Sequence, residues 1–196
     1  AYSTNGINWT EMSMPAGANW IGVTYGNGKF VAITQNNAYA AYSTNGITWM
    51  NTTLPTGVDF NSVTYGNDKF VAVAYYTDKG AYSADGITWT EFTFASNYWK
   101  SVTYGNGKFV AVASSTQYGS LVAYSSDGIS WSTMTLPTNS NWSSVTYGDG
   151  KFVAVAASSQ SGAYSTDGIH WTEFTMSASR SWYGVTYGNG KFVAVA

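Results

Sequence analysis

The stretch AYSTDGIHWTEF, residues 163–174, recurs with small changes five times along the chain and decides the fold class. The five copies begin about 40 residues apart, at Ala1, Ala41, Ala81, Ala123 and Ala163. A second phrase, VTYGNGKFVAV at residues 102–112, alternates with the first and also has five copies. The chain therefore consists of five copies of one repeat unit, and a period of this length is typical of repeat architectures.

Each unit divides into four short pieces rich in β-branched and aromatic residues, which predict strands. In the third unit the first two pieces are residues 99–104 and 108–113, separated by Gly-Asn-Gly. The other two pieces are the AYS and ITWTEFT segments, separated by Asn-Gly or Asp-Gly. We expect both pairs to be hairpins with tight type I′ turns, which need positive φ at both central residues. Nothing has the apolar spacing of a long helix, so the chain is predicted to be all-β.

A period near 40 residues with four strands per unit predicts a β-propeller. We expect one domain over residues 1–196, a five-bladed β-propeller of four-stranded antiparallel blades. The sequence opens on the third and fourth strands of a unit and closes on the first and second strands. We therefore expect residues 182–196 and 1–14 to share a closing blade, in which the N-terminal outer strands join the C-terminal inner strands. Such a ring has no long free edge.

Composition argues against several classes of protein. Charged residues are only 9% of the chain and the net charge is −2, without a run of either sign, so we expect no nucleic-acid partner. No apolar run approaches the roughly 20 residues of a membrane span, so no membrane insertion is expected. Cysteine is absent and histidine occurs once, so we expect no disulfide, metal or cofactor. We expect a monomer, and a surface made polar by Ser, Thr, Asn and Gly favours an extracellular or cell-surface location.

The phrase S-x-D-G-x-x-W resembles the Asp-box of bacterial neuraminidase repeat propellers. The residues that match are Ser83, Asp85, Gly86 and Trp89; Ser125, Asp127, Gly128 and Trp131; Ser165, Asp167, Gly168 and Trp171. Asn5 and Asn45 replace the Asp in the first two copies, and all five copies are one residue shorter between Asp and Gly than the usual form. In that family the Asp-box is a structural hairpin between the third and fourth strands. The resemblance therefore implies structural turns at Asn5, Asn45, Asp85, Asp127 and Asp167, with Gly6, Gly46, Gly86, Gly128 and Gly168.

The resemblance does not extend to sialidase chemistry. That activity would require an arginine triad, a Tyr–Glu nucleophile pair and an acid/base Asp, and Arg180 is the only arginine. Lysine cannot replace the bidentate guanidinium clamp. His170 takes the place of Thr, Ser or Asn in the other copies, so we interpret it as a solvent-facing hairpin residue. We expect no catalytic residues and no enzyme activity.

The copies diverge mainly in the links between second and third strands and between units, which by propeller geometry lie on one face. These links are rich in Asn, Ser, Thr, Gln and Tyr. Flat aromatic rings beside amides and hydroxyls suit sugars, whose C–H faces stack and whose hydroxyls form directional hydrogen bonds. The ligand-binding residues that we predict on this variable face are Tyr39, Tyr76, Tyr98, Tyr118, Tyr183, Asn19, Asn97, Asn141 and Arg180.

Two function classes follow from these observations. The first is a non-catalytic binding module, carbohydrate-binding in a lectin-like or adhesive manner, with glycans as partners. The second is a structural scaffold without a dedicated ligand, either recently amplified or engineered, or a platform for a protein partner. The near-identity of the five copies and the absence of Cys suit the scaffold, and the aromatic loops suit the binding module.

Overall fold

The computed structural model describes residues 1–35, 38–95, 98–114 and 120–196, and within these ranges its regular structure consists of β-strands without helices. The first strands of the repeats are β1 (Asn19–Gly26), β5 (Asp59–Gly66), β9 (Trp99–Gly105), β13 (Asn141–Gly148) and β17 (Gly184–Gly188). The second strands are β2 (Lys29–Gln35), β6 (Lys69–Tyr75), β10 (Lys108–Ala113), β14 (Lys151–Ala157) and β18 (Lys191–Val195). The third strands are β3 (Tyr39–Ser43), β7 (Lys79–Ser83), β11 (Leu121–Ser125) and β15 (Ser159–Ser165). The fourth strands are β4 (Met50–Thr53), β8 (Thr90–Thr93), β12 (Ser132–Thr135) and β16 (Thr172–Arg180).

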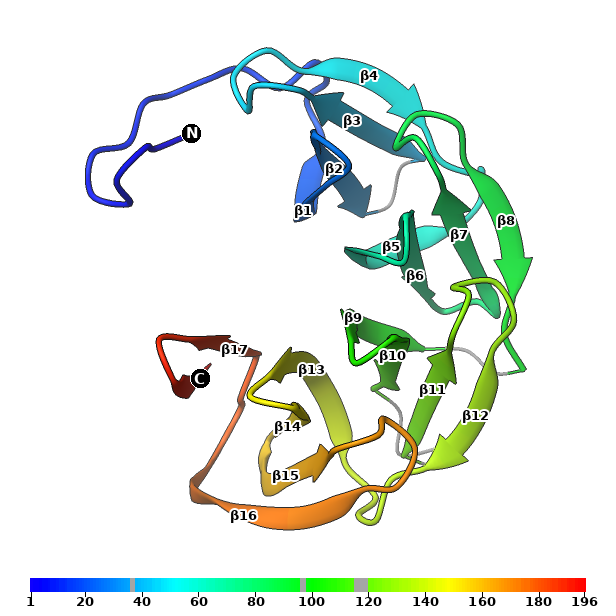
Figure 1. Cartoon of the computed structure of the whole chain (residues 1–196), viewed down its shortest axis with the longest axis vertical. Helices are drawn as coiled ribbons and strands as arrows, with labels where there is room; N and C mark the ends of the chain where they lie inside the picture. The colour runs from blue at the N-terminus through cyan, green and yellow to red at the C-terminus, as the bar shows by residue number, and fades with distance from the viewer. Residues whose placement is uncertain (36–37, 96–97, 115–119) are drawn as a thin grey trace.

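These strands form four antiparallel blades of four strands each, β1–β4, β5–β8, β9–β12 and β13–β16, and a two-stranded sheet, β17–β18. The blades stand side by side around an arc, with the first strands nearest the centre and the fourth strands on the outer rim (Figure 1). The predicted all-β propeller architecture is therefore confirmed. We number the blades 1 to 4 in chain order.

The prediction of a closed five-bladed ring is not what the structure contains. Residues 1–14 form only an isolated antiparallel bridge between Tyr2 and Thr10, and β18 pairs with β17 alone. Figure 1 shows a gap in the arc between this N-terminal segment and β17. Counting repeats gives the number of units, but the angle between blades is set by the packing at each interface, which the count does not contain.

The Gly-Asn-Gly turns between first and second strands have the predicted conformation. Gly26 pairs with Lys29, and the two residues between them have φ of 47° at Asn27 and 72° at Gly28, as a type I′ hairpin requires. The Asp-Gly and Asn-Gly turns between third and fourth strands do not have the predicted type I′ conformation. Only their glycine has positive φ, for example 73° at Gly86, and six residues separate the two strands. The prediction of type I′ turns there is wrong.

A different set of hydrogen bonds holds these longer loops. In blade 2, the Asp85 carboxylate accepts bonds from the backbone N–H groups of Ile87 and Thr88, both at 2.8 Å. The buried Ser83 hydroxyl donates to Asp85 at 2.9 Å and accepts from the Gly86 N–H at 2.8 Å. The four other copies repeat the pattern, with Asn5 or Asn45 in place of Asp in the first two. The side-chain oxygen organises its own loop, as expected of Asn and Asp in such turns.

The hydrophobic core lies between blades. Among the described residues there are three clusters of buried side chains, one at each junction of neighbouring complete blades. Each combines β-branched aliphatic residues of a second strand, valines or Ile33, with the aromatic residue that opens the next first strand. Phe60, Trp99 and Trp142 at that opening position are fully buried, in accordance with their interpretation as packing residues. The loop tryptophan of blade 3 packs against the fourth strand of blade 2: the Trp131 ring stacks on Phe92 with centroids 5.9 Å apart.

Two further contacts repeat at these junctions. The tyrosine of each first strand lies on the glycine that ends the preceding first strand, so closely that a Cβ on Gly26 would overlap the Tyr65 ring. In addition, the hydroxyls of Ser62, Ser101 and Ser144 each accept a hydrogen bond from a backbone N–H of the next sheet, at 3.1–3.2 Å. Blade 1 has Gly22 at this position and lacks the bond.

We predict that Gly22→Ser stabilises the protein by about 1 kcal/mol, because the new hydroxyl can accept a bond from the Val63 N–H, as its counterparts do. The added Cβ would lie 3.4 Å from Ile33 and 3.5 Å from Val63, which is ordinary packing distance. Urea unfolding measures the change. Gly184→Ser is the matched control, since β17 has no following blade to donate a bond. An equal gain in both variants would contradict this account of the junction.

Candidate functional site

The two faces of the blades differ in how firmly their loops are fixed. On one face the turns of neighbouring blades are joined, since the Asn67 amide donates to the Ser126 carbonyl at 3.0 Å and Asn106 donates to Thr166 at 3.1 Å. The links between second and third strands and between blades lie on the other face, because strands alternate in direction. This variable face carries the sequence differences among copies and is where a specific site can arise.

A cluster of three tyrosines lies on the variable face, where blade 2 meets the link to blade 3. Tyr75 ends β6, Tyr76 follows it, and Tyr98 precedes β9. The ring centroids of Tyr75 and Tyr76 are 4.1 Å apart, and Tyr98 lies 5.4 Å from Tyr75 and 5.3 Å from Tyr76, in edge-on geometry to both. Tyr76 remains 68% exposed. The cluster therefore presents an aromatic surface to solvent.

Two members of the tyrosine cluster have a backbone conformation that bulky residues rarely adopt. The φ angle is 63° at Tyr76 and 71° at Tyr98. The left-handed region costs a non-glycine residue roughly 1 kcal/mol or more, and such outliers concentrate at functional sites. The Ser114 N–H donates to the Tyr98 carbonyl at 3.0 Å, which ties the inter-blade link to the end of β10.

The Lys100 ammonium and the tyrosine hydroxyls supply the polar groups of this site. The Lys100 ammonium lies 5.2 Å from the centroid of the Tyr75 ring, within the range of a cation–π contact. Burial, followed by hydrogen bonding with Tyr76, raises the pKa of Tyr75 above its ordinary value. Tyr75 therefore keeps its proton at neutral pH and can act as a hydrogen-bond donor.

The structure brings together only some of the predicted ligand-binding residues. Tyr76 and Tyr98 are in contact in the tyrosine cluster, whereas the others are distributed over separate blades: Asn19 and Tyr39 in blade 1, Asn141 and Arg180 in blade 4, and Tyr183 before β17. Asn97 and Tyr118 lie outside the described residues.

Sequence reasoning missed Tyr75 and Lys100. Their signals were the adjacent Tyr75-Tyr76 pair, and a lysine outside the recurrent position after the glycine turns.

A cluster of serine hydroxyls occupies the same face where blade 3 meets blade 4. The Ser140 N–H donates to the Ser120 hydroxyl at 2.7 Å, and the Ser140 hydroxyl donates to Ser161 at 3.1 Å. Ser161 also accepts from Ser159 at 2.9 Å. These hydroxyls bond to one another and to the backbone, so their role is to order the links.

His170 lies in the turn loop of blade 4, on the face opposite the tyrosine cluster. Its Nδ1 is 2.7 Å from the Asp167 carboxylate, and its side chain is 82% exposed. Burial alone would raise the pKa of Asp167, but the hydrogen bonds from the His170 side chain and the loop amides outweigh it and hold this pKa well below the ordinary range. The pair is a solvent-exposed loop contact, as interpreted from the sequence.

In residues 1–35, 38–95, 98–114 and 120–196, no three side chains of His, Cys, Asp or Glu gather closely enough to bind a metal ion. Over the same described part of the chain there is no helix with the length and apolar character needed to cross a membrane.

Comparisons with known proteins show the fold. No protein-family model matches the sequence, and no curated protein matches it. Among solved structures, virginiamycin B lyase from Staphylococcus aureus superposes with a TM-score of 0.85 at 18% identity, over 97% of this chain and 68% of that one. YCF48 bound to a D1 peptide gives 0.72 at 15% identity, over 94% and 62%. A chain of the nidogen–laminin complex gives 0.73 at 9% identity, over 89% and 71%.

These likenesses place the chain among β-propeller proteins. The chain spans about two thirds of the length of the propellers on which it superposes. The arc in Figure 1 therefore has the curvature of part of a longer propeller.

We predict that the aspartate loops make stability sensitive to acid. The pKa values of Asp85, Asp127 and Asp167 are lowered in the folded protein by their loop hydrogen bonds. The unfolded chain consequently takes up protons first, and this part of the stability is lost as the pH falls below about 4.

The test is urea unfolding between pH 7 and 2 of the wild type and of a triple variant, Asp85→Asn, Asp127→Asn and Asp167→Asn. Asn45 shows that the amide supports the same loop, with bonds of 2.9 Å. The variant should lose less stability in acid. Parallel pH profiles for the two proteins would refute the assignment.

Proposed function

We propose that the chain is a non-catalytic binding module that binds a carbohydrate on its variable face, at the tyrosine cluster. The observation that carries the proposal is the packing of Tyr75, Tyr76 and Tyr98 against one another with the Tyr76 ring exposed. Pyranose rings present apolar C–H faces that pack on such rings, and the phenol hydroxyls and the Lys100 ammonium supply directional polar contacts.

The geometry supports a built surface over a chance gathering of loop residues. The rings come from two neighbouring blades, and the φ angle of 71° at Tyr98 carries a conformational cost that loop drift alone gives no reason to retain. The positive φ at Tyr76 recurs at the matching Ser158, at 54°, and belongs to the shape of this link. Because each ring is held by the other two, little side-chain freedom remains to be lost on binding.

The non-catalytic part of the proposal rests on the side chains that form the cluster, three tyrosines and Lys100, which include no histidine or carboxylate, although Asp59 pairs with Tyr75 across β5 and β6. The close pair His170 and Asp167 lies in an exposed loop on the opposite face, and its carboxylate already accepts bonds from the loop amides. Lyases appear among the proteins of similar fold, but a propeller fold hosts many functions and does not transfer an activity.

A second candidate is a platform for a protein or peptide partner. Two of the similar solved structures are named as complexes of this kind, YCF48 with a D1 peptide and nidogen with laminin. Tyrosine-rich surfaces are also common at protein interfaces, because tyrosine joins a large apolar ring to a hydroxyl. The same cluster would then receive a peptide in place of a sugar.

The direct test is a glycan array with the labelled protein, followed by titration of any ligand found. We predict that Tyr76→Asn weakens binding roughly tenfold, because the exposed ring is lost. Asn tolerates positive φ, so this variant removes the ring without straining the loop. Tyr183→Ala is the matched control, since Tyr183 is equally exposed, at 68%, but lies outside the cluster.

A folded protein that binds no glycan would refute the sugar proposal. Binding of peptides in a parallel peptide array, weakened by Tyr76→Asn, would then establish the second candidate. Blank results in both arrays would leave the ligand-free scaffold. Equal losses for Tyr76→Asn and Tyr183→Ala would show that the tyrosine cluster is not the site.

A further inference from the structure

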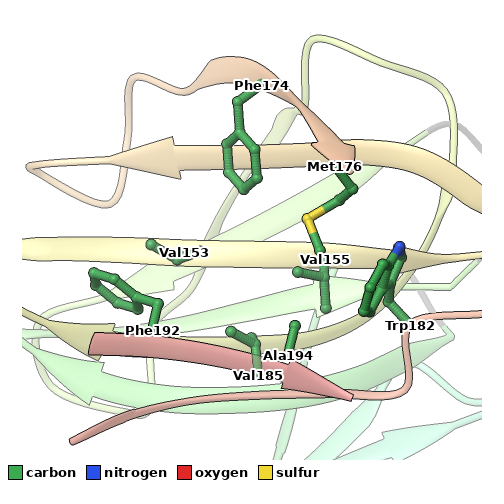
Figure 2. A pocket seen from close by; sticks show the side chains of 8 residues that line it. All are labelled: Val153, Val155, Phe174, Met176, Trp182, Val185, Phe192 and Ala194. Carbon is green, nitrogen blue, oxygen red and sulfur yellow. The ribbon is translucent and has the colours of Figure 1, made fainter. Parts of the chain in front are cut away.

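An apolar pocket of about 290 Å³ lies between blade 4 and the two-stranded sheet at the C-terminal end of the arc. Figure 2 shows its lining side chains, which come from β14, β16, β17, β18 and, for Trp182, the link before β17. They are Val153, Val155, Phe174, Met176, Trp182, Val185, Phe192 and Ala194. We call this the terminal pocket.

The terminal pocket is lined by the same set of residues as the core between two blades, but part of that core is missing. Aligned by repeat, its eight residues match eight members of the cluster between blades 2 and 3, namely Val71, Val73, Phe92, Phe94, Trp99, Val102, Phe109 and Ala111. In that complete junction Trp131 closes the space, with its ring 4.9 Å from the Phe94 ring and 5.9 Å from the Phe92 ring. Among the described residues, the lining of the terminal pocket includes no such tryptophan, and β18 pairs only with β17.

Residues 1–14 carry what the terminal pocket lacks. By repeat alignment, Trp9 is the counterpart of Trp131 and Gly6 is the counterpart of Gly128. This N-terminal segment is already folded as a hairpin: Tyr2 and Thr10 exchange backbone bonds of 2.9 and 2.8 Å, and Asn5 accepts from the Ile7 N–H at 2.9 Å. Its apolar side chains are nevertheless in solvent, with Ile7 80% and Trp9 64% exposed.

We propose that the terminal pocket binds the N-terminal segment of a second copy of this chain, and that two copies exchange these segments reciprocally. Trp9 of one copy enters the terminal pocket of the other, against Phe174, Met176 and Phe192. The residues from Ala1 to Ser3 pair with the free edge of β18. Exchange of an identical element between two copies produces a closed two-fold dimer at low cost. The added strand supplies backbone bonds, and the tryptophan supplies apolar burial.

A second copy is favoured over the same copy by the shape of the arc. The N-terminal segment and β17 lie on opposite sides of the gap in Figure 1. Closing that gap within one chain would require the arc to close further than it does in this structure, although the present arc superposes at a TM-score of 0.85 on a longer propeller. Exchange leaves the junctions between blades unchanged. It requires only that residues 15–18, which belong to no strand, change direction so that the N-terminal segment points toward the other copy.

The residue at position 149 affects how tightly the exchanged segment binds. At the inner junctions an asparagine donates to the loop of the next blade, as Asn67 does to Ser126 and Asn106 to Thr166. Blade 4 has Asp149 instead, which lies 3.6 Å from the Lys151 ammonium and has no N–H to donate. The exchanged segment therefore binds without this bond, and an amide at residue 149 would restore it.

Sedimentation velocity over a range of concentrations tests the proposal. The wild type should form a dimer, and Trp9→Ala should raise the dissociation constant at least about thirtyfold, as loss of a buried interface tryptophan does. Since Trp9 is exposed within its own chain, this variant should fold normally. Asp149→Asn should lower the dissociation constant about fivefold through the restored hydrogen bond.

A complementation experiment with two variants gives a result that misfolding of either variant could not produce. Ala194→Trp fills the terminal pocket with its own indole, so this variant can donate a segment but not accept one, while Trp9→Ala can accept but not donate. Each should be monomeric alone, and their mixture should form one-to-one dimers. A wild type that remains monomeric at all concentrations would overturn the proposal, whether Trp9 is then found buried in its own chain or exposed. So would a dimer that Trp9→Ala leaves unchanged.

Discussion

The contact of a first-strand tyrosine with the glycine of the preceding blade is the constraint on which the rest of the structure depends. A side chain at Gly26, Gly66, Gly105 or Gly148 would occupy the space of the next blade's tyrosine ring. Around this contact the second-strand valines, the loop tryptophan and the opening aromatic form a core that belongs to two blades at once. In the part of the chain that the structure describes, each buried cluster is shared by two blades, so stability is a sum over junctions, as in other repeat proteins.

This arrangement separates the faces by task. The turn face is committed to structure, because its Asp or Asn oxygens, loop amides and asparagine side chains bond to one another within and between blades. On the variable face such bonds order the links between blades 3 and 4, whereas Tyr75, Tyr76 and Tyr98 pack against one another across the junction of blades 2 and 3. The tyrosines that meet there come from two repeats, so this junction differs in its side chains from the junction of blades 3 and 4, where serine hydroxyls gather.

The sequence was sufficient for features encoded within one repeat. The strands, the Gly-Asn-Gly hairpins and the packing role of Trp99 and Trp142 follow from local patterns. Features that depend on more than one repeat were not predictable in the same way. The angle between blades arises from packing at the junctions, so five copies did not imply a closed ring. The contact of Tyr75 with Lys100 joins two strands of different blades, and no spacing along the chain reveals it.

If the junctions carry the stability, the middle of the arc should be its most protected part and the ends its least. Hydrogen exchange in dilute solution measures this directly. We predict the slowest exchange in the amides of β6 and β10, which lie between complete blades, and fast exchange in β18 and residues 1–14. Protection of β18 equal to that of β10 in the monomer would contradict an open arc and show instead that the chain closes on itself.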